Sequence, residues 1–304
     1  MASKAAPSHP ADSPHLTVVN VLGVSYTGTT WCSLLLGAGP TTFCVGEFDR
    51  VRKINRAHCT LHGERCELWR RFDLQSQENV FHQISRLTGQ RVLVLTNSKR
   101  FRRDQRHPSI RRAYVLLVRD GRSFVASARR KLADRSTAAL AWEWARETRK
   151  RYLRMVTDLR ARSVVVHHEQ LQKAPETQLR RICAAIDIPF NDAMLDYTHA
   201  APHYIGGNSG TLSVLARKHG LGTLYAQRHD KTIWPLDLSQ DRHVIQDSGE
   251  TVVVDHSAYR HPRDDDGRVH LDRWKRELST SDLRTFNIVG GWLNRSLGYR
   301  RDPT

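Results

Sequence analysis

The sequence lacks the features that define several large classes of protein. It has no apolar run long enough, about 18 residues, to cross a bilayer, so we expect no transmembrane helix. Residues 1–15 hold no apolar stretch of the kind found in secretory signals, and we interpret them as a disordered lead-in. Cysteine is scarce. The five cysteines are odd in number and form no Cys-x-x-Cys pair, which favours a reducing, cytoplasmic location over a disulfide framework.

Acidic residues are also few relative to basic ones. The 304-residue chain has 48 Lys and Arg against 31 Asp and Glu, a formal charge of +17. Residues 99–131 contain twelve basic and two acidic residues. Such a charge attracts anions such as nucleotides, sulfated or phosphorylated compounds, or nucleic acid. A solvated basic face would look the same, so charge alone does not identify a ligand.

The chain contains enough apolar residues to form a folded core. Hydrophobic residues make up 39% of the chain, and the seven Trp, eight Tyr and eight Phe exclude disorder of the whole chain. Short apolar, β-branched runs predict buried strands at 16–23, 91–96, 113–118 and 163–168. Helical patterns lie between and after them, roughly at 122–160 and 175–186. Strands that alternate with helices predict a single α/β domain over 16–304, with a parallel sheet covered on both faces.

The C-terminal third follows a different pattern. Residues 206–268 are rich in Gly, His, Asp and Arg and contain one β-like run, ETVVVDH. We interpret them as a long, partly irregular insertion or lid. The pattern after them predicts a terminal helix with Ser281 as its N-cap and Gly298 at its end.

The loop after the first predicted strand has the frame of a phosphate-binding loop. Residues 23–30 read GVSYTGTT, with Thr29 in the position of the usual lysine. Backbone amides and a helix N-terminus can still bind an anion there. The missing lysine argues against nucleoside triphosphate hydrolysis. An ordinary strand-to-helix turn is the alternative.

A second motif follows the third predicted strand. Arg119 comes directly after that strand, and Ser127 lies eight residues later on the next helix. Ligands of open α/β sheets bind beyond the carboxyl ends of the strands, where an arginine can hold a phosphate with two hydrogen bonds. A surface ion pair is the alternative for Arg119.

Together these motifs resemble the sulfotransferases that use 3′-phosphoadenosine 5′-phosphosulfate (PAPS). The run RDGRS is similar to that of tyrosylprotein sulfotransferases and bacterial relatives, and HYIGGN, DRWKRELS and CELW are also similar to family segments. The resemblance implies a P-loop-like three-layer α/β/α fold with a central parallel sheet. It also implies transfer of the sulfuryl group from PAPS to a hydroxyl of an acceptor that the sequence does not identify.

The resemblance also assigns residues to the nucleotide. The loop corresponds to the 5′-phosphosulfate site, and Arg119 with Ser127 corresponds to the 3′-phosphate site. The family usually has a cation where this chain has Tyr26, and Lys99 is our candidate replacement. Arg217 and Lys218 are candidates for a further arginine that the family has nearby. The expected nucleotide-binding residues are Ser25, Tyr26, Thr27, Gly28, Thr29, Thr30, Trp31, Arg119, Ser127, Arg217 and Lys218.

Glu47 is the expected catalytic base. The tyrosylprotein branch places a glutamate after a glycine at this distance from the loop, and here Gly46 and Glu47 match it. A carboxylate there could take the acceptor's proton. A helix cap or a salt bridge is the alternative role.

We expect no metal to be needed. Cys59, His62 and Cys66 could hold a metal or form a disulfide, but they offer three ligands, or four with His58, and structural zinc takes four well-spaced ones. Three other histidines could act as acids or bases, although structural roles are more common for such residues: His167, His168 and His203.

Three alternatives to a sulfotransferase remain open. A P-loop nucleotide kinase or hydrolase is disfavoured by Thr29. A nucleic-acid-binding protein is supported only by the net charge, so we do not expect that partner. A pseudoenzyme that binds nucleotide without transfer is suggested by Tyr26. The sequence does not predict an oligomeric state.

Overall fold

The structure is a computed structural model. It describes residues 15–99, 101–130, 132, 134–227, 233–247, 250–256 and 271–300. Residues 1–14 of the predicted lead-in therefore lie outside the described residues, as do three stretches of the predicted lid: 228–232, 248–249 and 257–268. Within the described part, no helix combines the length and apolar character that crossing a membrane requires.

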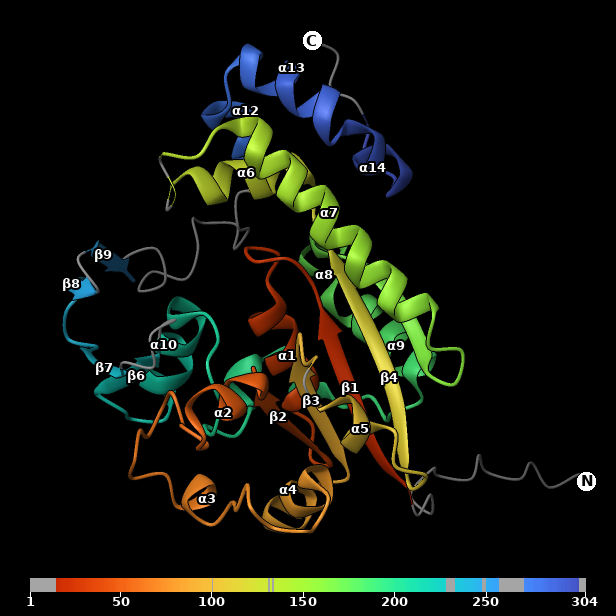
Figure 1. The fold of residues 1–304 in the computed structure, drawn as a ribbon, viewed down its shortest axis with the longest axis vertical. Helices are drawn as coiled ribbons and strands as arrows, with labels where there is room; N and C mark the ends of the chain where they lie inside the picture. Colours follow the sequence, from red (N-terminus) through yellow and green to blue (C-terminus); the bar gives the residue numbers. More distant parts are fainter. Residues whose placement is uncertain are drawn as a thin grey trace, which may run out of the picture.

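The centre of the molecule is a five-stranded parallel sheet with the order β2-β3-β1-β4-β5 (Figure 1). Its strands are β1 (Leu16–Leu22), β2 (Thr42–Gly46), β3 (Val92–Thr96), β4 (Ile110–Val118) and β5 (Arg162–His167). The first three are buried along their whole length, as expected of parallel strands covered by helices. Four of the five match the predicted strands, and β2 was not predicted.

Helices cover both faces of the sheet (Figure 1). The helices of the sheet region are α1 (Thr29–Gly37), α2 (Asp49–Ile54), α3 (Glu67–Arg70), α4 (Val80–Thr88), α5 (Arg102–Gln105), α6 (Gly121–Arg129), α7 (Thr137–Val156), α8 (His168–Lys173) and α9 (Pro175–Ile186). The predicted stretch 122–160 is two helices, α6 and α7, as expected. The three-layer α/β fold is confirmed.

The strand order fixes where a ligand can bind. The chain leaves β1 through α1 toward β2, at one edge of the sheet, but leaves β4 through α6 and α7 toward β5, at the other edge. The neighbouring strands β1 and β4 are thus followed by connections that run in opposite directions, the position where open α/β sheets commonly bind ligands. The residues that follow Leu22 and Val118 therefore lie at the topological switch point of the sheet.

The region predicted as a lid is more regular than expected. Beyond the short 3₁₀ helices η2 (Asp192–Leu195) and η3 (Tyr197–His199), the described residues form α10 (Ser209–Lys218), the hairpin β6 (Thr223–Gln227) and β7 (Ile233–Asp237), and the pair β8 (Arg242–Asp247) and β9 (Glu250–Asp255). Leu224 and Leu236 of the first hairpin are buried in the main core. That hairpin is therefore packed on the domain.

The C-terminal helices form a second core against α6 and α7. They are α12 (Trp274–Glu277), α13 (Thr280–Val289) and α14 (Gly291–Ser296). Trp144 and Phe286 pack at a ring distance of 5.7 Å within this core. The predicted N-cap Ser281 is wrong. Ser279 caps α13, because its hydroxyl accepts a hydrogen bond from the amide of Asp282, and the Asp282 carboxylate accepts one from the amide of Ser279.

Candidate active site

The loop between β1 and α1 is a tight turn that ends at the N-terminus of a helix. Both the amide and the hydroxyl of Thr27 donate to the carbonyl oxygen of Val24, at 3.3 and 2.6 Å. Gly28 has a φ of +85°, and a Cβ there would lie 2.8 Å from the ring of His168, so no larger residue fits. Helix α1 starts at Thr29, and the amides of a first helical turn lack intrahelical partners. Amides at such a helix N-terminus are the groups that commonly bind anions in proteins.

Arg119 reaches this loop from the end of β4. Its Nη1 donates to the carbonyl oxygen of Tyr26 at 2.6 Å and to the hydroxyl of Ser127 at 3.5 Å. Burial lowers the pKa of the Arg119 guanidinium, and the charge of Arg130 lowers it further, against the opposing effect of Glu169. Its Nε is buried and, among the described residues, has no hydrogen-bond partner. The predicted pairing of Arg119 with Ser127 is thus present, with a donor free for an anion.

Arg130 is a member of this group that the sequence analysis missed. Its Nη2 donates to Ser127 at 3.5 Å, and its Nη1 lies 3.7 Å from the Glu277 carboxylate. Two arginine side chains therefore meet at one hydroxyl, where they repel each other. An anion bound between them would relieve that repulsion. The sequence held a signal for Arg130, because a residue three positions after Ser127 lies on the same face of the helix.

His168 forms the floor of the loop. It is buried, its ring contacts the Trp31 ring edge-on at 5.8 Å, and burial together with the charge of Arg119 lowers its pKa to about 3. A neutral ring at physiological pH fits beneath a glycine. Nearby, His167 Nε2 lies 2.7 Å from the carbonyl oxygen of Leu297. Both histidines support the fold, as the sequence analysis favoured.

Glu47 follows β2 and faces the chain segment after Tyr204. Its carboxylate accepts from Arg50 Nε at 2.5 Å, and its amide donates to the carbonyl oxygen of Ile205 at 2.8 Å. A Cβ on Gly206 would lie 2.9 Å from Glu47 Oε2, so the carboxylate lies against this segment. The alternative role that the sequence allowed, a salt bridge, is thus present, and Arg50 holds the carboxylate in one orientation.

The same segment connects Glu47 to the loop. The amide of Asn208 donates to Thr30 Oγ1 at 3.1 Å. Because Gly206 and Asn208 are two residues apart, their Cα atoms are at most about 7 Å apart. One short segment, residues 206–208, therefore contacts both Glu47 and Thr30. Sequence reasoning missed Asn208, although the similarity of HYIGGN to the family was a signal.

Tyr204 anchors that segment in the core. Its hydroxyl lies 3.0 Å from Ser33 Oγ and 2.9 Å from Thr96 Oγ1, joining α1 and β3. Burial raises the pKa of the Tyr204 phenol well above its usual range, so the group stays neutral. A buried network with all three hydroxyls paired fixes the position of the backbone that follows.

Lys99 follows β3 and lies among other basic residues. Its amide donates to the Asp49 carboxylate at 2.6 Å. Burial lowers the pKa of the Lys99 ammonium, and the charge of Arg151 adds to that effect. Asn97, two residues earlier, accepts from the amide of Gly23 at 3.0 Å and from Arg151 at 3.2 Å. This asparagine joins the start of the loop to the surroundings of Lys99, a link that sequence reasoning missed.

Other predicted nucleotide ligands take different positions. The Tyr26 ring packs on Phe124 at 5.9 Å, while its backbone, at a φ of 65°, accepts from Arg119. Arg217 donates to the carbonyl oxygen of Leu238 at 3.2 Å, and Lys218 is exposed beside it. Both lie at the end of α10 that is about 13 Å from the Thr30 contact. The structure does not bring them to the loop.

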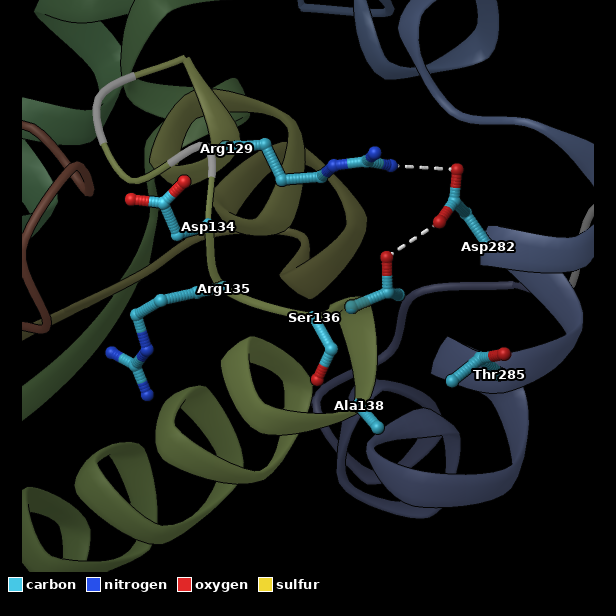
Figure 2. A pocket seen from close by; sticks show the side chains of 8 residues that line it. Arg129, Asp134, Arg135, Ser136, Ala138, Asp282 and Thr285 are labelled. Atoms are coloured by element: carbon cyan, nitrogen blue, oxygen red, sulfur yellow. Dashed lines mark hydrogen bonds and ion pairs between the residues drawn. The ribbon is translucent and has the colours of Figure 1, made fainter.

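The molecule also has a shallow depression near the end of α6, shown in Figure 2. Its basic groups are paired: Arg129 donates to Asp282 at 2.7 Å, and Arg135 donates to Glu143. Thr137 donates to the other oxygen of Asp282 at 2.5 Å. The depression is lined by Arg129, Asp134, Arg135, Ser136, Thr137, Ala138, Asp282 and Thr285. Both arginines of the depression are thus paired with carboxylates.

Comparison with protein families gives the identification. A model described as a sulfotransferase family matches residues 19–192, more than half of the chain. The chain belongs to the sulfotransferase family. The match covers the loop, Glu47, Lys99, Arg119 and Ser127, and it confirms the family resemblance; the tyrosylprotein branch stays a prediction. No curated protein matches the chain.

One solved sulfotransferase domain shares the fold of this chain, and two further solved structures are similar with lower TM-scores. A sulfotransferase domain from the curacin biosynthetic pathway is similar over 95% of this chain and 99% of its own, with a TM-score of 0.53 at 15% identity. The sulfotransferase domain of the Synechococcus PCC 7002 olefin synthase covers 64% of this chain and 81% of its own, with a TM-score of 0.46 at 17% identity. A mouse sulfotransferase in complex with PAP is similar over 94% of this chain and 89% of its own, with a TM-score of 0.43 at 12% identity.

Proposed function

We propose that this sulfotransferase moves the sulfuryl group of PAPS to a hydroxyl acceptor. The observation that carries the proposal is Arg119, which extends from the end of β4 to the loop after β1. Its Nε is buried and has no hydrogen-bond partner within the part of the chain that the structure describes. Such a donor at a topological switch point is suited to an anionic ligand. The similarity of the two motifs to PAPS-dependent enzymes supports the same ligand.

The residues present fit a nucleotide with two phosphate positions. The amides of the loop and of the first turn of α1 would hold the 5′-phosphosulfate, and Arg119, Ser127 and Arg130 would hold the 3′-phosphate. Gly28 lets the backbone lie directly on His168 and so forms the floor of the first position. Bound PAPS supplies the sulfuryl group and leaves as the 3′,5′-bisphosphate PAP.

Glu47 is the proposed base for the transfer. As the acceptor oxygen bonds to sulfur, the carboxylate takes the hydroxyl proton, and the bond from sulfur to the bridging phosphate oxygen breaks in line. Arg50 orients the carboxylate, much as a catalytic base is commonly held by a third group. The contacts of Gly206 with Glu47 and of Asn208 with Thr30 support this placement.

We propose that Lys99 and the N-terminus of α1 stabilise the negative charge that develops on the leaving phosphate. A positive group placed before the reaction stabilises that charge without reorganisation. Burial, and after it the charge of Arg151, lowers the pKa of Lys99, and an anion that develops beside the two cations would offset their repulsion. Tyr26 packs on Phe124 and supplies no charge. A cytoplasmic location and chemistry without a metal stay predictions.

The direct test is transfer of labelled sulfur from PAPS to a panel of phenols, sugars and tyrosine peptides. We expect label in at least one acceptor, loss of that activity in Arg119→Ala, and normal activity in Arg180→Ala, which removes an exposed arginine of α9. Magnesium-dependent hydrolysis of ATP would favour a P-loop kinase or hydrolase instead. Binding of duplex DNA that is unaffected by Arg119→Ala would favour a nucleic-acid-binding protein.

A further inference from the structure

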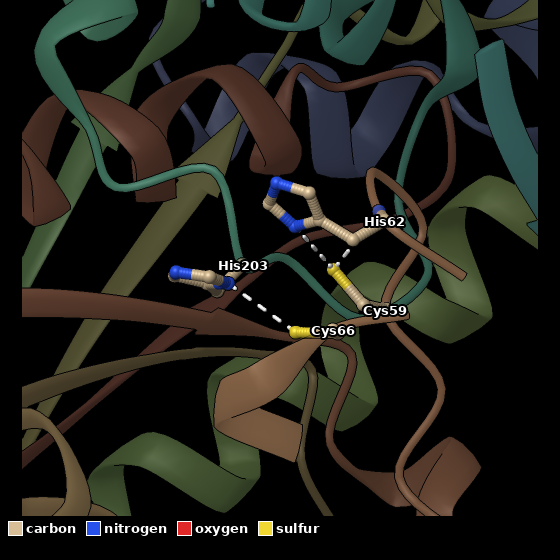
Figure 3. A group of neighbouring side chains, drawn as sticks. All are labelled: Cys59, His62, Cys66 and His203. Carbon is tan, nitrogen blue, oxygen red and sulfur yellow. Dashed lines mark hydrogen bonds between the residues drawn. The ribbon is translucent and has the colours of Figure 1, made fainter. Parts of the chain in front are cut away.

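Four side chains that can bind a metal lie close together, as Figure 3 shows. One of them, His203, directly precedes the segment 204–208 that contacts Glu47 and Thr30. They are Cys59, His62, Cys66 and His203, and their ligand atoms all lie within 4.8 Å of one another. The sequence offered three close ligands, and the fourth, His203, comes from 137 residues beyond Cys66. His58, the fourth ligand considered from sequence, instead places its Nε2 3.3 Å from the carbonyl oxygen of Tyr225.

The spacing of the four atoms suits a tetrahedral metal ion. In zinc sites with bonds of about 2.3 Å to sulfur and about 2.0 Å to nitrogen, neighbouring ligand atoms are roughly 3.3 to 3.8 Å apart. Here His62 Nδ1 lies 3.6 Å from Cys59 Sγ, and His203 Nδ1 lies 3.3 Å from Cys66 Sγ. Both cysteines are buried and free, with no disulfide between them.

The backbone around the cluster is also arranged for a thiolate. The amide of His62 points to Cys59 Sγ at 3.4 Å, and the amide of Gly63 closes a tight turn on the Cys59 carbonyl oxygen at 2.9 Å. Gly63 takes a φ of +60°, which favours glycine. Trp69 donates its indole N–H to the carbonyl oxygen of His203 at 2.7 Å and fixes that residue. Groups that hold ligands in place are typical of structural metal sites.

We propose that Cys59, His62, Cys66 and His203 bind one structural Zn²⁺ ion. Two thiolates and two imidazoles are a donor set that zinc prefers. All four tetrahedral positions come from the protein, which leaves none for a substrate, so the ion is structural. The proposal does not depend on the identity of the sulfate acceptor or of the nucleotide.

The zinc ion would fix the segment that carries the active-site contacts. His203 directly precedes Tyr204, and the residues after it reach Glu47 and Thr30. The loop that contains Cys59 is also hydrogen-bonded to this segment. The Thr60 amide donates to the Tyr204 carbonyl oxygen at 2.8 Å, and the Thr60 hydroxyl donates to the Gly206 carbonyl oxygen at 3.0 Å. A metal that joins both segments would therefore stabilise the fold and the position of Glu47 together.

The first test is the metal content of the full chain, purified without metal-affinity resin. We expect about one zinc ion per chain by plasma mass spectrometry. Cys66→Ser and His203→Gln should lose the zinc and unfold at lower temperature, while Cys183→Ser, a buried cysteine outside the cluster, should keep it. Retention of zinc in both cluster variants would overturn the assignment.

A second test does not need the variants to fold. We would remove metal from the wild-type chain with a chelator and a reductant, then titrate it with Co²⁺ and record the visible spectrum. We expect saturation at one equivalent, with the intense bands of tetrahedral, thiolate-bound cobalt, and displacement by Zn²⁺. Weak octahedral bands, no saturable binding, or a Cys59–Cys66 disulfide in a peptide map of the native protein would refute the site.

Discussion

Two adjacent arginines at the end of α6 differ in how closely their charges are paired with carboxylates. Arg129 is paired at 2.7 Å with Asp282, which also accepts from Thr137. Arg130 has a long contact of 3.7 Å with Glu277 and otherwise turns toward Ser127, which it shares with Arg119. The first arginine lines the depression of Figure 2, and the second belongs to the proposed nucleotide site.

The comparison shows why the net charge of +17 does not locate a ligand. Many of the basic side chains of the described residues are neutralised by nearby carboxylates, as in the pairs of Arg112 with Asp158 and of Arg122 with Asp120. In contrast to the depression, the loop side has a buried donor, Arg119 Nε, that has no hydrogen-bond partner among the described residues. Basic groups bind an external anion where the protein has left them unpaired.

Glu47→Gln should have the largest effect if chemistry takes place on the loop side. The variant keeps the shape and loses the proton acceptor, so turnover with an alcohol should fall by about 10²- to 10⁴-fold. Single-turnover transfer of labelled sulfur would measure this, with Glu64→Gln as the exposed control. PAP affinity should stay near that of the wild type. A normal transfer rate would remove Glu47 from the mechanism.

Lys99→Ala should reduce turnover by about 10²-fold, because the charge that Lys99 meets appears in the transition state. The affinity for PAP should change far less. Steady-state kinetics with saturating nucleotide would separate the two effects, and Lys150→Ala, an exposed lysine of α7, is the control. A loss of affinity with unchanged turnover would assign Lys99 to nucleotide binding only.

Arg119→Ala and Arg129→Ala test the comparison directly. Loss of the Arg119 guanidinium should weaken PAP binding by about 2 kcal/mol, or about 30-fold, and should affect adenosine 5′-phosphate much less. Arg129→Ala should leave both affinities unchanged, because its charge is already paired. Calorimetric titrations of the two nucleotides into both variants would decide. Equal weakening of PAP by the two substitutions would contradict the distinction between the two sites.

Arg130→Ala should have a smaller effect on PAP, about 5-fold, since the side chain is exposed and salt screens its charge. The effect should shrink as ionic strength rises. Titrations at low and high salt would check this. A salt-independent loss would indicate that the substitution disturbs α6 and not the electrostatics of the site.

Asp282→Asn should leave PAP binding unchanged and affect only stability. Burial opposes ionisation of Asp282, but hydrogen bonds from Thr137, Ser279 and Arg129 outweigh it and lower its pKa to about 2. Its stabilising effect is therefore complete above the usual carboxyl pKa of about 4 and is lost as the pH falls through about 2. Thermal unfolding from pH 7 to pH 2 should show a gap between wild type and variant that closes at the acid end.

The control for that series is Asp272→Asn, an exposed carboxylate 3.7 Å from Lys275. It should change the melting temperature little at any pH. A gap for Asp282→Asn that persists at the acid end would show that the substitution acts through packing and not through charge.

The sequence predicted the parts of the fold whose signals are local. The strands β1, β3, β4 and β5 are β-branched runs, and the motif at Arg119 combines a strand end with a position on the following helix. In contrast, β2 reads TFCVG and ends in a glycine, so that only Phe43, Cys44 and Val45 form an apolar run, which is too short to distinguish from a loop. Helix α10 begins with Ser and Gly, both weak helix formers.

Contacts between distant segments could not be read from the sequence. His203 joins the cysteine cluster only because Tyr204 and Ile205 return to the edge of the sheet, where Gly46 and Ile205 form a parallel bridge. Neither periodicity nor spacing links residue 203 to residues 59–66. Asn97 and Asn208 were missed for the same reason, since each contacts the loop from a segment more than 70 residues away.

The central claim is that the switch point between β1 and β4 binds a nucleotide with both a 3′- and a 5′-phosphate. Calorimetric titration of the wild-type chain with PAP and, separately, with adenosine 5′-phosphate tests it most directly. We predict one PAP site per chain, with at least about 10-fold higher affinity for PAP, because only PAP places a phosphate between Arg119 and Arg130. Equal affinity for the two nucleotides, or no binding of either, would contradict the account.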